Sequence, residues 1–291
     1  MKPFPVPVLA DASLASAEGP QVSFVPGRME TFERPARHAP TSKAAQREAV
    51  RLVSSLLERM RAVPFAPWDE GDRRPAPPFL SLTHAPRAVV DEVNDLLGQG
   101  EVSCRIDGPR PVHIQETAFP SVWRVQLLAP DGSVTEDRIE TGAFPAAARI
   151  RALPSPGTVE PDPEPDAEPD GLMNSPALIR EIRHRAAHWR PGDPAHVINL
   201  TLLPVTPQDL QYLGDTLGRG PIGILSRGYG SCRIGSTGLG NVWWVQHFHN
   251  MGQMILNTIE IVDLPIAAQA AVQDYEDSCE RLGEWLAAVE D

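Results

Sequence analysis

A stretch of 52 residues occurs twice in this chain, and this duplication limits the possible folds more than any other feature. Residues 97–148 align without a gap on residues 217–268, and 16 of the 52 aligned pairs are identical. Chance would give about three or four identical pairs at ordinary residue frequencies. Two copies are too few for a solenoid, so we predict two similar half-domains or two adjacent domains.

The composition of the remaining segments predicts the domain boundaries. Residues 1–41 are rich in Pro, Ala and Ser without sustained periodicity, which predicts a disordered N-terminal arm. Residues 154–170 contain six acidic and no basic residues, which is typical of an extended acidic linker. The first repeat unit is therefore expected over 42–153. The second is expected over 171–291, ending in a long C-terminal helix.

Hydrophobic periodicity predicts the same order of elements in both units. In the first unit a helical pattern over 42–62 precedes a short strand at 79–83 and a helix at 86–97. Three strand-like runs follow, at 101–106, 121–128 and 133–141. The second half repeats this plan. The predicted fold class is α+β, with two similar α-β-α-β-β-β units whose helices pack on antiparallel or mixed sheets.

The chain lacks the motifs that enzymes and cofactor-binding proteins use. The Gly-rich segment 228–241 does not have the glycine spacing of a dinucleotide or phosphate loop, and no GxSxG elbow is present. The three cysteines, Cys104, Cys232 and Cys279, are widely spaced and contain no CxxC. We therefore predict no enzymatic activity, no cofactor and no metal site.

Two histidine pairs leave a metal-binding or redox role open as an alternative. His184 and His188 are four residues apart on a predicted helix, and His247 and His249 share one face of a predicted strand. Neither pair has a counterpart in the first copy. Four arginines on the first of these helices disfavour a cation, so packed or solvated histidines are the simpler interpretation.

Comparison of the two copies separates residues expected to build the fold from residues expected to bind a partner. The pairs Gly98/Gly218, Gly100/Gly220, Trp123/Trp243 and Glu140/Glu260 are shared, which favours structural roles. The candidate partner-binding residues differ from their first-copy counterparts Asp107, Pro109, His113 and Arg124; they are Arg227, Tyr229, Arg233 and Trp244.

The net charge of −12 argues against non-specific binding of nucleic acid. Prolines interrupt the N-terminal segment, so it is not a convincing secretory signal, and no apolar run reaches the ~18 residues that a membrane span needs. We predict a cytoplasmic protein without membrane insertion.

Several motifs in the second half resemble one known family. They are Asp170-Gly-Leu-Met-Asn174, Ile198-Asn-Leu-Thr201 with Leu203-Pro204, Gly228-Tyr-Gly230, Thr237-Gly-Leu239 with Val242-Trp243, and Glu260 before Leu264-Pro265. Together with Gly98–Ser103 and Trp123-Arg-Val125 they resemble the HupH/HyaF/HoxQ family of hydrogenase expression proteins. None of these motifs is catalytic in character.

The resemblance implies an accessory chaperone for the maturation of an uptake [NiFe] hydrogenase. Its client would be the iron–sulfur small subunit, bound before twin-arginine export and assembly with the large subunit, and a thioredoxin-like accessory protein would be a further partner. Two alternatives stay open: a metal-binding or redox maturation factor that uses the histidine pairs, and an adaptor between other maturation proteins.

Overall fold

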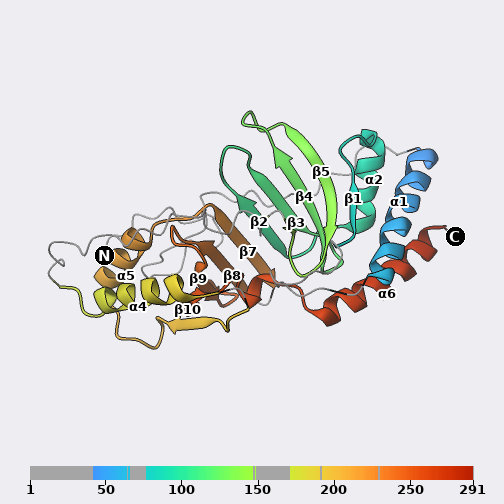
Figure 1. Ribbon diagram of the computed structural model, residues 1–291. Coiled ribbons are helices and arrows are strands. Elements are labelled where there is room, and N and C mark those ends of the chain that lie inside the picture. Colours follow the sequence, from blue (N-terminus) through green and yellow to red (C-terminus); the bar gives the residue numbers. More distant parts are fainter. Residues whose placement is uncertain are drawn as a thin grey trace. The chain divides into compact units, whose positions relative to one another are not determined.

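The computed structural model describes residues 42–63, 65, 77–146, 148, 171–190, 192–228 and 230–290 (Figure 1). These residues form two compact units. The first unit contains the described residues between Glu30 and Ala148 together with those from Gln269 onward, and the second contains those between Arg149 and Ala268. The predicted N-terminal arm, 1–41, and the predicted acidic linker, 154–170, lie outside the described residues.

The described residues of the first unit include three helices and a five-stranded sheet of order β1-β5-β4-β3-β2. Its elements are α1 (Lys43–Ala62), β1 (Phe79–Ser81), α2 (Arg87–Leu97), β2 (Val102–Ile106), β3 (Val112–Glu116), β4 (Val122–Leu128), β5 (Val134–Thr141) and α6 (Val272–Glu290).

The second unit has a sheet of the corresponding order, β7-β8-β9-β10-β6. Its elements are α4 (Ser175–His188), β6 (His196–Asn199), α5 (Pro207–Leu217), β7 (Ile222–Gly228), β8 (Gly230–Ser236), β9 (Val242–Phe248), β10 (Met254–Ile261) and a short 3₁₀ helix, η1 (Ile266–Ala268). The strand pairs described within both units are antiparallel.

Each unit buries an apolar core between its helices and one face of its sheet. In the first unit the buried stripe of α1, which includes Val53, Leu56 and Met60, packs with α2 and with Val122 and Ile139 of the sheet. In the second unit Ile182 of α4 and Leu213 of α5 pack with residues of β9 and β10. Helices that pack on antiparallel sheets confirm the α+β class.

Each unit has one more strand than the sequence predicted, so the order is α-β-α-β-β-β-β. The strands that the sequence analysis did not predict are β3 and β8, and β8 forms from part of the Gly-rich segment 228–241. Glycines hide β8, whereas β3 has only five residues and its alternation covers only two apolar side chains, Val112 and Ile114. In β8, Gly235 stands directly opposite the large indole of Trp244, where a glycine leaves room for the ring.

Helix α6 belongs to the first unit, whereas the sequence assigned the long C-terminal helix to the second. Its side chains Tyr275, Leu282 and Leu286 lie in the core of the first unit. The Tyr275 hydroxyl donates a hydrogen bond to the carbonyl oxygen of Met60 (3.0 Å), and the Ser278 hydroxyl donates to that of Pro120 (2.7 Å). The assignment to the second unit was wrong because it rested on the position of the helix directly after that unit in the sequence. The chain instead returns to the first unit after residue 268.

Glu116, at the end of β3, is a buried carboxyl group with little compensation. Its Oε2 accepts a hydrogen bond from the backbone N–H of Val102 (3.3 Å). Burial raises the pKa of Glu116 to about 7, and the Val102 hydrogen bond opposes this shift only in part. In the second unit the hydroxyl of Ser236 accepts the equivalent hydrogen bond from Ile222 (2.9 Å) without a charge.

We expect Glu116→Gln to stabilise the protein at pH 8 and to change its stability little at pH 5. Because the folded-state pKa is raised, the wild-type protein loses stability as the pH rises from the unfolded value, about 4.5, to about 7. The neutral amide of Gln does not ionise, so the variant avoids this loss. Its free energy of unfolding at pH 8 should exceed that of the wild type by up to about 3 kcal/mol. Urea unfolding at both pH values measures the effect, with Glu58→Gln, which neutralises an exposed carboxylate of α1 in the same unit, as the control. Parallel pH profiles for wild type and Glu116→Gln would contradict the expectation.

Across the described residues, no helix combines the length and hydropathy needed to cross a lipid bilayer.

Candidate functional site

The histidine pairs do not form a metal-binding arrangement. The rings of His184 and His188 lie 4.3 Å apart between centroids, and Nδ1 of His188 is 2.7 Å from the carbonyl oxygen of His184. His249 Nδ1 accepts a hydrogen bond from the backbone of Met251 (3.4 Å). Among the residues that the structure describes, no group of three or more His, Cys, Asp or Glu side chains could hold a metal ion.

His247 instead faces Cys232 across the β8–β9 pair, with 3.7 Å between Nε2 and Sγ. Burial and, to a smaller extent, the nearby Glu260 carboxylate together raise the pKa of the Cys232 thiol to about 12. Burial also lowers the pKa of His247. The couple is therefore a neutral thiol and a neutral imidazole at pH 7, which does not favour nucleophilic or redox chemistry.

Of the four predicted partner-binding residues, two are buried. Arg233 is 3% exposed and its guanidinium lies over the ring of Phe248, 4.7 Å from the centroid. Trp244 is 1% exposed in the core of the second unit. Neither side chain can touch a partner in this state. Arg227 is exposed at the end of β7, and Tyr229 lies outside the described residues.

The difference between Trp244 and Arg124 is explained by packing. In the first unit Arg124 forms a buried ion pair with Asp137, with 2.5 Å between Nη2 and Oδ2. In the second unit Trp244 donates an indole hydrogen bond to Asn257 (2.6 Å), which occupies the position equivalent to Asp137. Each copy carries a matched pair, so this divergence preserves a buried polar contact in each fold.

The shared glycines occupy positions where the backbone excludes a side chain. Gly98 and Gly218 follow α2 and α5 with φ values of +61° and +62°, a conformation that favours glycine at a helix C-terminus. At Gly100 and Gly220 a Cβ atom would lie 2.2 and 2.3 Å from the carbonyl oxygens of Thr117 and Thr237. Each of the two pairs therefore supports the same turn in both units.

The shared tryptophans and glutamates also have structural contacts. Trp123 and Trp243 are fully buried, and their indoles donate to the carbonyl oxygens of Gly142 (2.9 Å) and Val262 (3.0 Å). Glu140 pairs with Arg138 (2.6 Å between Oε1 and Nε), and Glu260 accepts a hydrogen bond from the Thr258 hydroxyl (3.1 Å). Each of the two carboxylates therefore has a structural partner within its own unit.

Four segments of the second unit come together at one end of its sheet. Strand β7 ends there, and the turns β7–β8 and β9–β10 lie there because these strands are consecutive and antiparallel. Strand β6 is antiparallel to β10, so the loop after Asn199 reaches the same end. The N–H of Asn257 donates to the Thr201 hydroxyl (2.8 Å), and the Asn174 amide donates to the Pro204 carbonyl (2.7 Å).

Large apolar side chains are exposed at this end. Leu202 is 80% exposed, Met251 83%, Met173 63% and Ile255 56%, and Leu203 is also exposed. We call these five residues the apolar end; they are Met173, Leu202, Leu203, Met251 and Ile255. Exposed apolar groups that gather in one place mark interaction sites more often than isolated ones do. The sequence analysis did not predict that these five residues form a surface. Two of them, Met173 and Leu203, lie inside the motifs that carry the family resemblance.

One buried carboxylate, that of Asp209 in α5, holds the backbone around Met173 in place through hydrogen bonds. Its Oδ1 accepts hydrogen bonds from the N–H groups of Met173 (2.9 Å), Asn174 (3.1 Å) and Ser175 (3.0 Å) and from the Ser175 hydroxyl (2.6 Å). Its Oδ2 accepts from the N–H and the hydroxyl of Thr206, both at 2.9 Å. Asp209 thereby joins the N-terminal ends of α4 and α5.

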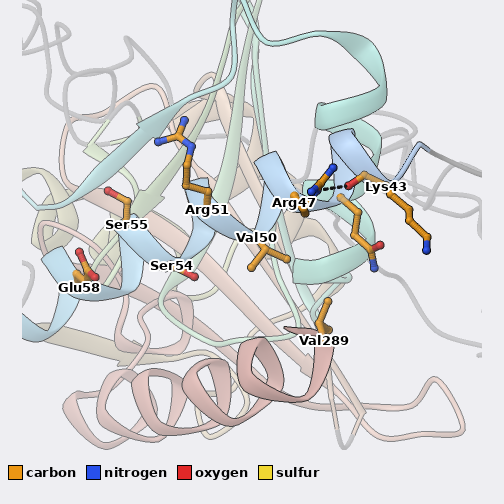
Figure 2. A pocket seen from close by; sticks show the side chains of 9 residues that line it. Lys43, Arg47, Val50, Arg51, Ser54, Ser55, Glu58 and Val289 are labelled. Atoms are coloured by element: carbon orange, nitrogen blue, oxygen red, sulfur yellow. Dashed lines mark hydrogen bonds between the residues drawn. The ribbon is translucent and has the colours of Figure 1, made fainter. Parts of the chain in front are cut away.

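A groove of about 830 Å³ lies along α1 in the first unit (Figure 2). Its floor includes Val50 and Val289, and its rim carries the cations of Lys43, Arg47 and Arg51. Arg51 is paired with Glu48 (2.6 Å), and Arg47 Nε donates to the Lys43 carbonyl (3.3 Å). The groove therefore follows the solvent face of one helix and brings together no group suited to a specific reaction.

The chain matches one family of known proteins along most of its length. A family model described as "HupH hydrogenase expression protein, C-terminal conserved region" matches residues 49–153 and 172–289. "Hydrogenase expression/formation protein HoxQ" of Cupriavidus necator is 38% identical over 294 residues, covering 99% of this chain and 100% of the relative.

Other relatives carry similar descriptions. "Hydrogenase expression/formation protein HupH" of Rhodobacter capsulatus is 43% identical over 70% of each chain. "Hydrogenase-1 operon protein HyaF" of Escherichia coli is 37% identical over 67% of this chain and 68% of its own. A solved structure, "Hydrogenase expression protein HupH from Thiobacillus denitrificans", is 28% identical, covers 40% of this chain and 96% of its own, and has a TM-score of 0.38.

Proposed function

The chain belongs to the HupH family of hydrogenase expression proteins, and on that premise we propose that it is an accessory chaperone in the maturation of an uptake [NiFe] hydrogenase. Its client is the iron–sulfur small subunit, held in the cytoplasm before twin-arginine export and assembly with the large subunit. Family membership is the observation that carries this proposal.

The site supports a binding role. The apolar end offers exposed side chains for protein contact. The Cys232–His247 couple in the second-unit sheet offers no reactive group, because burial raises the pKa of the thiol and lowers that of the imidazole. A metal-binding or redox factor that uses the histidine pairs gains no support from their geometry, because the rings of His184 and His188 contact one another at a tilt of 36° and no third ligand joins them among the described residues.

We expect the purified chain to form a stoichiometric complex with the small-subunit precursor. Affinity purification of a tagged chain from cells that produce the precursor, followed by mass determination of the complex, measures this. An adaptor would instead retain the thioredoxin-like protein and not the client. Absence of a complex with the precursor, together with unchanged hydrogenase activity after gene deletion, would refute the proposal.

A further inference from the structure

We propose that the apolar end of the second unit is the client-docking surface, and that it covers an uncharged apolar face of the unassembled subunit, of the kind that a permanent partner later buries. This inference rests on the proposed function for the identity of the client. The surface itself is inferred from the structure of the second unit.

The first argument is that the apolar end is held in place by hydrogen bonds. Six hydrogen bonds to Asp209 order the segment around Met173 and the start of α5. Leu202 and Leu203 lie in a turn closed by bonds from Leu202 N–H to the Asn199 carbonyl (3.2 Å) and from Val205 N–H to the Leu203 carbonyl (2.9 Å). A surface ordered before binding loses less conformational entropy when a partner docks.

The second argument is the charge of the segments that carry the apolar end. Residues 171–175, 199–206 and 249–255 contain no Asp, Glu, Lys or Arg, although 22% of the chain is charged. The cores of protein interfaces are likewise depleted of charge. Charged residues flank these segments in the chain, and they include Asp170 directly before Gly171 and the buried Asp209 three residues after Thr206. Arg227 is an exposed cation at the end of β7. A twin-arginine segment would meet no carboxylate on these segments, so the surface suits the body of the client.

The third argument comes from the first unit, which builds the same sheet with a different surface at the corresponding end. The positions equivalent to Met251 and Ile255 are Asp131 and Thr135, and the loop with Leu202 and Leu203 replaces a shorter loop containing His84 and Ala85. Val134 is an exposed apolar exception at that end of the first unit. The fold therefore does not require apolar side chains here.

The kind of client follows from these properties. Interfaces of permanent complexes resemble a protein core that has been divided, and they are more apolar than transient interfaces. A subunit that waits for its partner exposes such a face. A neutral, ordered, apolar surface complements it without requiring an exchange of ion pairs.

The test compares binding of variants to the purified small subunit by calorimetry or surface plasmon resonance. Leu202→Ser/Met251→Ser removes two exposed apolar side chains that docking would bury, and it should therefore weaken binding at least about tenfold. Val134→Ser is the matched control, since it removes an exposed apolar side chain at the corresponding end of the first unit. Circular dichroism checks that both variants are folded.

Three client forms complete the design: the precursor, the mature subunit without its export peptide, and the assembled hydrogenase. We expect the first two to bind alike and the assembled enzyme to bind at least about tenfold more weakly. Unchanged affinity of Leu202→Ser/Met251→Ser, or a requirement for the export peptide, overturns this inference while the proposed function stands. The wild-type chain could also self-associate through the apolar end. If Leu202→Ser/Met251→Ser makes the chain monomeric but leaves client binding unchanged, the inference is overturned. No binding by the wild-type chain removes the proposed function as well.

Discussion

Replacing Asp209 with asparagine is expected to lower the free energy of unfolding of the second unit by about 3–5 kcal/mol, because a charged acceptor of six hydrogen bonds is lost. The side chain is fully buried, so water cannot replace the missing partners. An asparagine oxygen could still serve the four donors around Met173, but its NH₂ group would face the N–H and hydroxyl donors of Thr206. The Thr206 N–H would then be left without an acceptor, and the Thr206 hydroxyl would have to turn its proton away from the NH₂ group.

The acid dependence of stability provides a second signature of the same carboxylate. Although burial opposes ionisation, hydrogen bonds from Ser175 and Thr206 hold the pKa of Asp209 well below its ordinary value. Because the folded-state pKa is depressed, its stabilisation is complete above the unfolded pKa, about 4, and is lost as the pH falls below it. The asparagine variant should lose less stability on acidification than the wild type.

Urea unfolding at pH 7 and pH 3 measures both effects, and hydrogen exchange locates them. Faster exchange at the N-terminal turns of α4 and α5 is expected in the variant. Asp215→Asn is the matched control, since it neutralises an exposed carboxylate on the same helix. Equal stability of Asp209→Asn and Asp215→Asn would show that the hydrogen bonds to Asp209 do not hold the two helices together.

The second large effect is expected in the first unit, where Arg124→Met should lower the free energy of unfolding by about 3–5 kcal/mol. The substitution leaves the Asp137 carboxylate buried without its cation. The loss includes a second contact, because Arg124 Nε also donates to Asp137 Oδ1 (3.0 Å). Removing one partner of a buried ion pair lowers the free energy of unfolding more than removing both, because the remaining charge stays buried without compensation.

The double variant Arg124→Met/Asp137→Asn tests that asymmetry. Asparagine is the residue that the second unit uses at this position, so more than half of the lost stability should return. A double-mutant cycle measured by urea unfolding gives the coupling between the two side chains. If the losses of the two single variants simply add in the double variant, the ion pair is not coupled and the expectation is wrong.

The residues shared by both copies allowed much of the fold to be predicted. Structural roles were expected for Trp123/Trp243 and Gly98/Gly218 because both copies share them, and the tryptophans lie in the core while the glycines follow α2 and α5 with positive φ. These features depend on local chemistry, which sequence periodicity reports directly. The α+β class followed from the order of elements.

Other features depended on contacts between segments distant in sequence. Strand β8 is stable despite its glycines because it pairs on both sides, with β7 and β9. Trp244 was expected to contact a partner because it differs from Arg124, but the compensating change of Asp137 to Asn257 becomes visible only when the strand register is known. The apolar end was missed for the same reason, since its residues come from three separate turns.

The assignment of α6 to the first unit has a consequence for the synthesis of the protein. The ribosome releases α1 first and α6 only after the whole second unit has been made. Until then the apolar stripe of α1 lacks the side chains of Tyr275, Leu282 and Leu286 that complete its core. The second unit, which carries the apolar end, is therefore the one whose residues are all available first. On a translating ribosome, the order in which the two units mature should be the reverse of their order in the gene.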